Sequence, residues 1–190
     1  MPKIFEVGGC VRDEILNVKT DDIDFTFVLD DLSGTVESGW DSMVSHLDSE
    51  GFKIFLKTED CFTVRAMFPR GLQHEGLVEV IDLFDGVKDL KRGVLKTPLD
   101  PVITLLDDPL RLLRALRFSI TKNFKIDDDL WNAMFTPGLL DKLELVVSKE
   151  RIQNEVKKMM KHNTVESLRL FNRIDQNEPR LLEIMFGGEM

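Results

Sequence analysis

The stretch from Gly8 to Phe25 constrains this chain most, because it joins a glycine turn to two closely spaced carboxylates. Asp22 and Asp24 stand at positions i and i+2 of a segment that continues Phe-Thr-Phe-Val-Leu, the pattern of a buried strand. On a strand, such residues leave the same face, roughly 6 to 7 Å apart. Their mutual repulsion is relieved by a proton or by a shared cation. Because oxygen-only ligands favour a hard ion, the pair predicts a site for a cation such as Mg²⁺.

The glycine turn predicts the other half of a nucleotide site. Gly8 and Gly9 follow a predicted strand over 3–7 and precede a predicted helix over 11–16. Glycines let the backbone turn tightly and bring N–H groups close to a ligand. The start of a helix favours anions such as phosphate. The alternative is a simple turn followed by a solvated acidic loop, since short motifs match by chance.

Composition narrows the class of protein. The chain has 190 residues, 43% hydrophobic and 31% charged, which indicates one or two globular units and excludes disorder. It has no apolar run of membrane-spanning length and no signal-peptide core, so we expect no membrane association. Cys10 and Cys61 form neither a disulfide framework nor a zinc motif. We therefore expect a reduced, cytoplasmic setting.

Charge is distributed unevenly along the chain. The net charge is -9, yet residues 1–60 hold 5 Lys/Arg against 14 Asp/Glu and account for the whole excess. The segment 148–173 is more cationic, with seven Lys/Arg against three Glu. An acidic start and a cationic helical end suit a metal site and an RNA backbone, respectively. Solvated helix faces would explain the cationic segment equally well.

The order of predicted elements is strands first and helices afterwards. We predict a helix over 40–51, a hairpin formed by 52–56 and 62–68, and a further strand over 77–84. From residue 101 the hydrophobic period becomes helical, with helices predicted over 104–120, 127–134 and 139–147.

The predicted helix over 104–120 has two distinct faces. Six aliphatic residues share an arc of about 120° and are expected to pack inward: Leu105, Leu106, Leu112, Leu113, Leu116 and Ile120. Acidic and arginine residues lie opposite. Spacing alone favours a row of surface ion pairs on that face.

Gly8-Gly9-Cys10-Val11-Arg12-Asp13, followed by Asp22-Ile23-Asp24, resembles the start of class II tRNA nucleotidyltransferases, the CCA-adding enzymes, and of bacterial poly(A) polymerases. The segment from Asp107 to Phe118 resembles the family block Glu-Asp-x-x-Arg-x-x-Arg-x-x-Arg-Phe. This resemblance implies that Asp108 and Arg111 read the base edge of the incoming nucleotide. Arg114 is a further nucleotide-binding candidate, and Arg12 a phosphate contact. An Asp acceptor beside an Arg fork can distinguish cytosine and adenine from guanine and uracil.

Two further blocks extend the resemblance over nearly the whole chain. Residues 81–98 resemble the family segment that joins head to neck, and Glu150-Arg151-Ile152 through Glu155 resembles the Glu-Arg-Ile-x-x-Glu block. The resemblance implies an α+β fold in two parts. A small mixed β-sheet head with flanking helices would span 1–100, and an all-helical neck 101–190. RNA-binding candidates on the neck are Lys149, Arg151, Lys157, Lys158 and Lys161.

The chain departs from the family pattern in two places. The family's Arg-Arg-Asp segment is not found, and the chain is shortened over 70–77, where a loop could also have been omitted. Glu79 is a possible substitute metal ligand or a surface glutamate. The chain also stops just past the predicted neck.

The resemblance implies template-independent addition of CCA, or part of it, to the 3′ end of tRNA from CTP and ATP. One or two Mg²⁺ ions held by Asp22 and Asp24 would assist the displacement of pyrophosphate. The alternatives are a poly(A)-polymerase-like enzyme and a non-catalytic nucleotide- or RNA-binding remnant. The sequence leaves the oligomeric state open.

Overall fold

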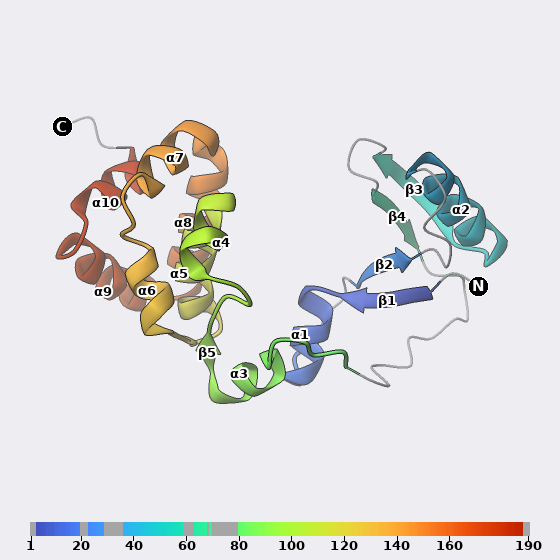
Figure 1. The fold of residues 1–190 in the computed structure, drawn as a ribbon, viewed down its shortest axis with the longest axis horizontal. Helices are drawn as coiled ribbons and strands as arrows, with labels where there is room; N and C mark the ends of the chain where they lie inside the picture. The colour runs from blue at the N-terminus through green and yellow to red at the C-terminus, as the bar shows by residue number, and fades with distance from the viewer. Residues whose placement is uncertain are drawn as a thin grey trace. The chain divides into compact units, whose positions relative to one another are not determined.

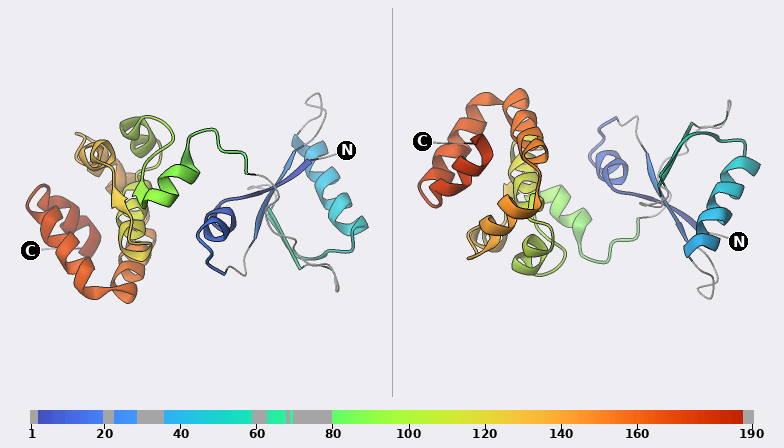
Figure 2. Two further views of the ribbon diagram at one scale, coloured as in Figure 1. Left: turned by 90° about the horizontal axis from the view of Figure 1, so that it is seen from below. Right: turned by 90° about the horizontal axis from the view of Figure 1, so that it is seen from above.

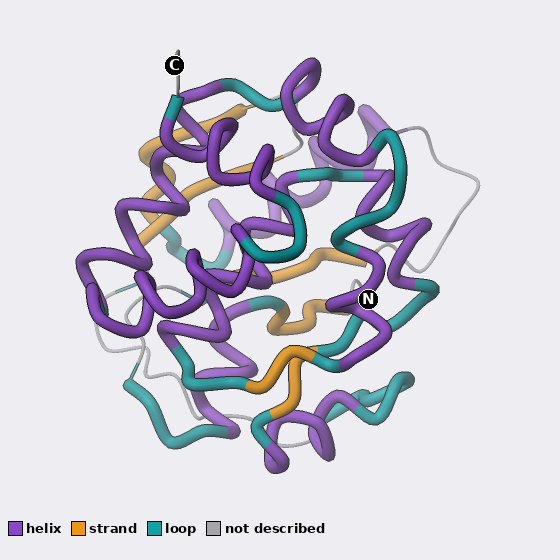
Figure 3. The backbone as a smooth tube through the Cα atoms, turned by 90° about the vertical axis from the view of Figure 1, so that its left-hand side faces the viewer, coloured by secondary structure: helices purple, strands orange, loops and turns teal. Residues whose placement is uncertain are grey.

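The computed structural model describes residues 3–19, 23–28, 36–58, 63–67, 69 and 80–187. The chain divides into two compact units, Met1–Ile81 and Asp82–Met190, here called the N-terminal and C-terminal units. This division falls earlier than the boundary near residue 100 that we predicted. Helices and short strands are mixed (Figure 3), and this confirms the predicted α+β fold class.

The described part of the N-terminal unit contains two antiparallel strand pairs and two helices (Figure 1). Its elements are β1 (Lys3–Val7), α1 (Gly9–Ile15), β2 (Asp24–Val28), α2 (Val36–Ser49), β3 (Lys53–Thr58) and β4 (Thr63–Met67). β1 pairs with β2 so that Val7 lies opposite Asp24. β3 pairs with β4 with one irregularity between Ile54 and Leu56. The predicted first strand and the predicted hairpin are therefore confirmed.

β2 is exposed, so our prediction of a buried strand is wrong. Phe25 is 43% exposed and Val28 38%. Among the described strands β2 pairs only with β1, and only its Phe27 is partly buried, with its ring 5.8 Å from that of His46 in α2. Within the described residues, no layer of structure therefore covers most of the apolar side chains of β2.

The C-terminal unit is helical (Figures 1 and 2), and its described residues, 82–187, contain one short strand pair. Its elements are α3 (Gly86–Arg92), β5 (Val94–Leu95), α4 (Pro101–Asp107), α5 (Leu110–Thr121), β6 (Lys125–Ile126), α6 (Asp128–Ala133), α7 (Leu139–Val146), α8 (Lys149–His162), α9 (Thr164–Asp175) and α10 (Pro179–Phe186). β5 and β6 pair in parallel. This pairing explains why α3 and β5 belong with the helices rather than with the preceding strands.

The hydrophobic core lies in the C-terminal unit. Leu105, Leu112, Leu113 and Leu116 are at most 1% exposed, and they belong to the predicted apolar stripe. Helices α5 and α8 pack together there, and Ile152 and Met159 of α8 are buried against the same core. Burying aliphatic side chains stabilises this packing by roughly 1.5 to 3 kcal/mol each.

The predicted strand over 77–84 is not present in its described part. Residues 80–85 form no strand, and 77–79 lie outside the described residues. The Asp82 carboxylate instead accepts hydrogen bonds from the backbone N–H groups of Gly86, at 2.8 Å, and Val87, at 2.9 Å. These are first-turn donors of α3 that lack partners within the helix. The segment therefore begins a helix rather than ending a sheet.

The predicted helix over 104–120 is two helices. α4 ends at Asp107, Asp108 is extended with φ -132° and ψ 99°, and α5 begins at Leu110. The physical reason is Pro109, because a proline ring disfavours helical geometry at the residue before it. The break changes the direction of the chain at the residues for which a nucleotide-binding role was predicted.

No helix among the described residues has the length and apolar character needed to cross a membrane.

Candidate functional site

The glycine turn and Asp24 lie against each other. Gly8 has φ 80° and ψ -135°, a backbone conformation that residues with a side chain rarely adopt. A Cβ at Gly8 would stand 3.2 Å from Asp24 Oδ2. The strand register, which places Val7 opposite Asp24, creates this approach. The structure therefore brings together two of the predicted site residues.

Cys10 anchors the turn to both strands, a role that sequence reasoning missed. Its side chain is 4% exposed. The thiol donates to the Val7 carbonyl at 3.0 Å and lies 3.8 Å from the Asp24 carbonyl. A small apolar residue directly after two glycines is the signal that could have indicated a buried anchor.

Arg12 is engaged by its neighbour in the chain. Its Nε and Nη2 atoms donate to the two carboxylate oxygens of Asp13, at 2.9 and 2.8 Å. This is a bidentate pair, the strong form of an arginine–carboxylate contact. To contact a phosphate, the Arg12 guanidinium would have to share its N–H donors between the phosphate and Asp13, or leave Asp13.

The metal site remains a prediction. Asp22 and Glu79 lie outside the described residues. Within the described ranges, no group of three or more His, Cys, Asp and Glu side chains could hold a metal ion. Asp24 is exposed at the first position of β2.

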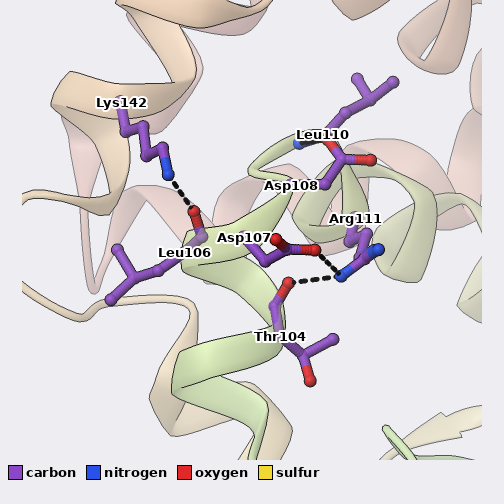
Figure 4. Close-up of polar contacts among 7 residues, drawn as sticks. All are labelled: Thr104, Leu106, Asp107, Asp108, Leu110, Arg111 and Lys142. Atoms are coloured by element: carbon purple, nitrogen blue, oxygen red, sulfur yellow. Dashed lines mark hydrogen bonds and ion pairs between the residues drawn. The ribbon is translucent and has the colours of Figure 1, made fainter.

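The second group of predicted residues lies at the break between α4 and α5 (Figure 4). Asp108 Oδ1 accepts a hydrogen bond from the backbone N–H of Leu110 at 3.1 Å. This bond caps the start of α5 and uses one of the two carboxylate oxygens. Asp108 is partly buried, whereas Asp107 is exposed.

Arg111 is held on one side of its guanidinium group. Nη1 donates to the Thr104 carbonyl at 3.0 Å and to Asp107 Oδ2 at 2.9 Å. Within the described part of the chain, Nε and Nη2 have no hydrogen-bond partner, so one donor edge is left for a ligand. Asp107, in the position of the family's glutamate, thus orients Arg111, a contact that the i,i+4 spacing could have indicated.

Arg114 is exposed on the following turn of α5. No hydrogen bond or ion pair to another described residue fixes its side chain. Its nucleotide-binding role remains a prediction.

Lys142 of α7 reaches the same break, and sequence reasoning did not find it. Its Nζ donates to the Leu106 carbonyl at the end of α4 (Figure 4). The two residues are 36 positions apart. No local pattern could have indicated this contact.

Two of the sequence blocks are joined by a nearly buried ion pair. Arg117 Nε of α5 donates to Glu155 Oε2 of α8, and the side chains are 17% and 9% exposed. Lys158 Nζ lies 3.7 Å from the other Glu155 oxygen. Arg117 also stacks over the Phe118 ring, with its Cζ atom 4.1 Å from the ring centroid. The two blocks therefore form one packed structure.

The cationic residues of α8 lie on its surface. The five predicted RNA-binding residues are exposed: Lys149, Arg151, Lys157, Lys158 and Lys161. Lys158 also forms an ion pair with Glu155. Lys157 and Lys161 stand one turn apart, on the side of α8 opposite its buried residues.

Comparison with solved structures defines the class of fold. A CCA-adding enzyme with CTP superposes with a TM-score of 0.73 and 22% identity, over 98% of this chain and 48% of that one. A tRNA nucleotidyltransferase with a primer tRNA and an ATP analogue gives a TM-score of 0.72 and 21% identity, over 100% and 60%. The chain therefore has the fold found in CCA-adding enzymes.

Sequence comparison gives the particular relationship. A CCA-adding enzyme of Limosilactobacillus fermentum is 31% identical, over 85% of this chain and 46% of that protein. The CCA-adding enzyme of Ligilactobacillus salivarius is 30% identical, over 87% and 47%. A nucleotidyltransferase of Purpureocillium lilacinum is 39% identical over 52% of this chain. The chain is thus related to the CCA-adding enzymes, and it spans about half the length of these two. No protein-family model matches.

Proposed function

We propose that this chain is a template-independent RNA nucleotidyltransferase that adds CCA, or part of it, to the 3′ end of tRNA. CTP and ATP are the substrates, and pyrophosphate is the leaving group. The observation that carries the proposal is the break between α4 and α5, where Asp108 offers a carboxylate oxygen and Arg111 offers a donor edge. The relatives named CCA-adding enzymes support it.

Base selection follows from the hydrogen-bonding groups at this break. A carboxylate accepts from the exocyclic amino group that cytosine and adenine share, and a guanidinium donates to a ring nitrogen. Uracil and guanine present a carbonyl oxygen and an N–H in the corresponding places, so both contacts become unfavourable. A buried polar group left unpaired costs about 1 to 3 kcal/mol, which would favour CTP and ATP over UTP and GTP by about five- to a hundredfold.

The N-terminal unit would handle the triphosphate. Asp22 and Asp24, with Glu79 as a possible third ligand, offer oxygen donors of the type that Mg²⁺ prefers. The ion would supply charge neutralisation and polarisation of the reacting oxygens. Gly8 allows a close approach to the Asp24 carboxylate, and Gly9 lies against the Arg12 guanidinium, which would contact a phosphate after release from Asp13.

The exposed cationic residues of α8, Lys149, Arg151, Lys157, Lys158 and Lys161, would contact the phosphate backbone of the RNA. Contacts of this kind give affinity that falls with salt and carries no sequence information. We propose that the reaction takes place in the cytoplasm.

Incorporation of labelled CTP and ATP into tRNA that lacks its CCA end tests the proposal. We expect incorporation by the chain and a loss of at least about a hundredfold in Asp22→Ala and Asp24→Ala. Unchanged activity in both variants would refute the metal assignment. Lys125→Met is a suitable control, because Lys125 is 77% exposed and remote from these residues in sequence.

A second candidate is a nucleotide- or RNA-binding remnant without turnover. The observation that favours it is the scarcity of buried side chains in the N-terminal unit. Among the described residues of that unit, Cys10 is the one buried hydrophobic residue. Binding of CTP and ATP without incorporation would support this candidate. Extended products from ATP alone would instead indicate a poly(A)-polymerase-like enzyme.

A further inference from the structure

The end of α4 has backbone carbonyl groups that the helix itself cannot satisfy. Pro109 has no N–H to offer, and the Leu110 N–H is taken by the Asp108 carboxylate. The Leu106 carbonyl, which the Leu110 N–H would meet in a continuous helix, is therefore left without its helical partner.

Two cationic side chains donate to carbonyl groups of this last turn. Arg111 of α5 donates at 3.0 Å to the Thr104 carbonyl, which also accepts from the Asp108 N–H at 3.5 Å. Lys142 of α7 donates to the Leu106 carbonyl (Figure 4). Positive charge at this end of α4 also interacts favourably with the negative C-terminal end of the helix dipole. Lys142 thus connects the end of α4 to the middle of α7.

We propose that Lys142 is a positioning residue for base selection. By holding the Leu106 carbonyl, it fixes the last turn of α4 and hence the direction in which Asp108 leaves the chain two residues later. Arg111 fixes the same turn from the other side. This inference rests on the proposed role of Asp108 and Arg111 in reading the base.

Lys142 suits this role because it is partly buried and comes from a separate element. Leu105, on the same turn, is 1% exposed, and Pro109 is fully buried, so little room is left for rearrangement. Loss of the Lys142 ammonium group leaves the Leu106 carbonyl dependent on water. The last turn of α4 then gains freedom, and the hydrogen bond from the Leu110 N–H to Asp108 weakens.

The test compares Lys142→Met and Lys142→Arg with the exposed control Lys125→Met in the full chain. Hydrogen exchange of the Leu110 amide, measured without nucleotide, reports the Asp108 contact directly. We expect about fivefold faster exchange in Lys142→Met, near wild-type exchange in Lys142→Arg, and no change in the control. The amide of Met159, in the core of α8, reports global unfolding and should keep its rate.

Equilibrium binding of CTP, ATP, UTP and GTP gives the functional readout. We expect the preference for CTP and ATP over UTP and GTP to fall about fivefold in Lys142→Met and to recover in Lys142→Arg. Unchanged Leu110 exchange, or equal acceleration at Leu110 and Met159, would overturn the positioning role. Unchanged nucleotide preference despite faster Leu110 exchange would overturn its link to base selection. If the wild type binds none of the four nucleotides, the proposed function fails, while Leu110 exchange still decides whether Lys142 holds Asp108.

Discussion

At the scale of single residues, the candidate site depends on backbone positions with little tolerance. Gly8 combines a positive φ with a 3.2 Å approach of its Cβ position to the Asp24 carboxylate. Asp82 holds the start of α3 through one carboxylate. At each of these positions a single residue determines where a helix begins, α1 after Gly8 and α3 after Asp82.

Gly8→Ala should destabilise the N-terminal unit by about 1 to 2 kcal/mol, because the added methyl group strains the backbone and displaces Asp24. Urea unfolding followed by Trp40 fluorescence, in a Trp131→Phe background, measures this. Gly9→Ala is the matched control for stability. Its Cβ would stand 3.4 Å from the flexible guanidinium of Arg12, and we expect less than about 0.5 kcal/mol. Equal effects of the two changes would contradict the argument.

The pKa of Asp82 is lowered by hydrogen bonds from the backbone N–H groups, that of Val87 first and then Gly86. Since the folded pKa lies below the unfolded one, the carboxylate stabilises α3 above the unfolded pKa. This contribution is lost as the pH falls through the folded pKa. NMR titration should place the Asp82 carboxyl lower in the folded chain than in urea, and the amides of Gly86 and Val87 should titrate with it. Asp82→Asn should abolish that acid-induced change, and identical Asp82 titrations in the two states would refute the prediction.

At the scale of elements, the helices of the C-terminal unit are joined by specific polar contacts as well as by apolar packing. Arg117 and Glu155 join α5 to α8, and Lys142 joins α7 to α4. A nearly buried ion pair is costly to break on one side, because the remaining charge has lost its partner.

Arg117→Met should therefore lower the free energy of unfolding by about 3 kcal/mol, since Glu155 would keep only the more distant Lys158. Chemical denaturation followed by circular dichroism measures this. Arg169→Met is the matched control, because the Arg169–Glu166 pair is exposed on α9 and should contribute less than about 1 kcal/mol. A similar loss of unfolding free energy in both variants would show that burial does not increase the contribution of the Arg117–Glu155 pair to stability.

At the scale of the whole molecule, the buried core of the described residues belongs to the C-terminal unit. Every buried hydrophobic side chain of the described residues except Cys10 lies at Leu105 or beyond. The chain has two tryptophans, Trp40 in the N-terminal unit and Trp131, 8% exposed, in the C-terminal unit. Each unit therefore has its own fluorescent reporter.

The two units should unfold in separate transitions, and each single-tryptophan variant should report one of them. With Trp40→Phe, the remaining Trp131 should report a steep transition at high urea, because the slope increases with the surface exposed on unfolding. With Trp131→Phe, the remaining Trp40 should report a shallower transition at lower urea. Coincident transitions with equal slopes would contradict the separation of the two units.

Features that depend on neighbours in the chain could be predicted from the sequence. Strand alternation located β1 and the hairpin of β3 and β4, and helical periodicity located the buried leucines of α4 and α5. The break at Asp108 was also a local signal, since Pro109 restricts the residue before it, but the continuous apolar stripe concealed it.

Contacts between distant residues and the covering of surfaces could not be predicted, because they depend on tertiary packing. Lys142 and Leu106 are 36 residues apart, and Arg117 and Glu155 are 38 apart. Sequence patterns carry no information on such pairs, because their approach depends on how whole helices pack. The exposure of β2 is of the same kind: its apolar residues are those of a buried strand, and burial depends on whether another layer covers them.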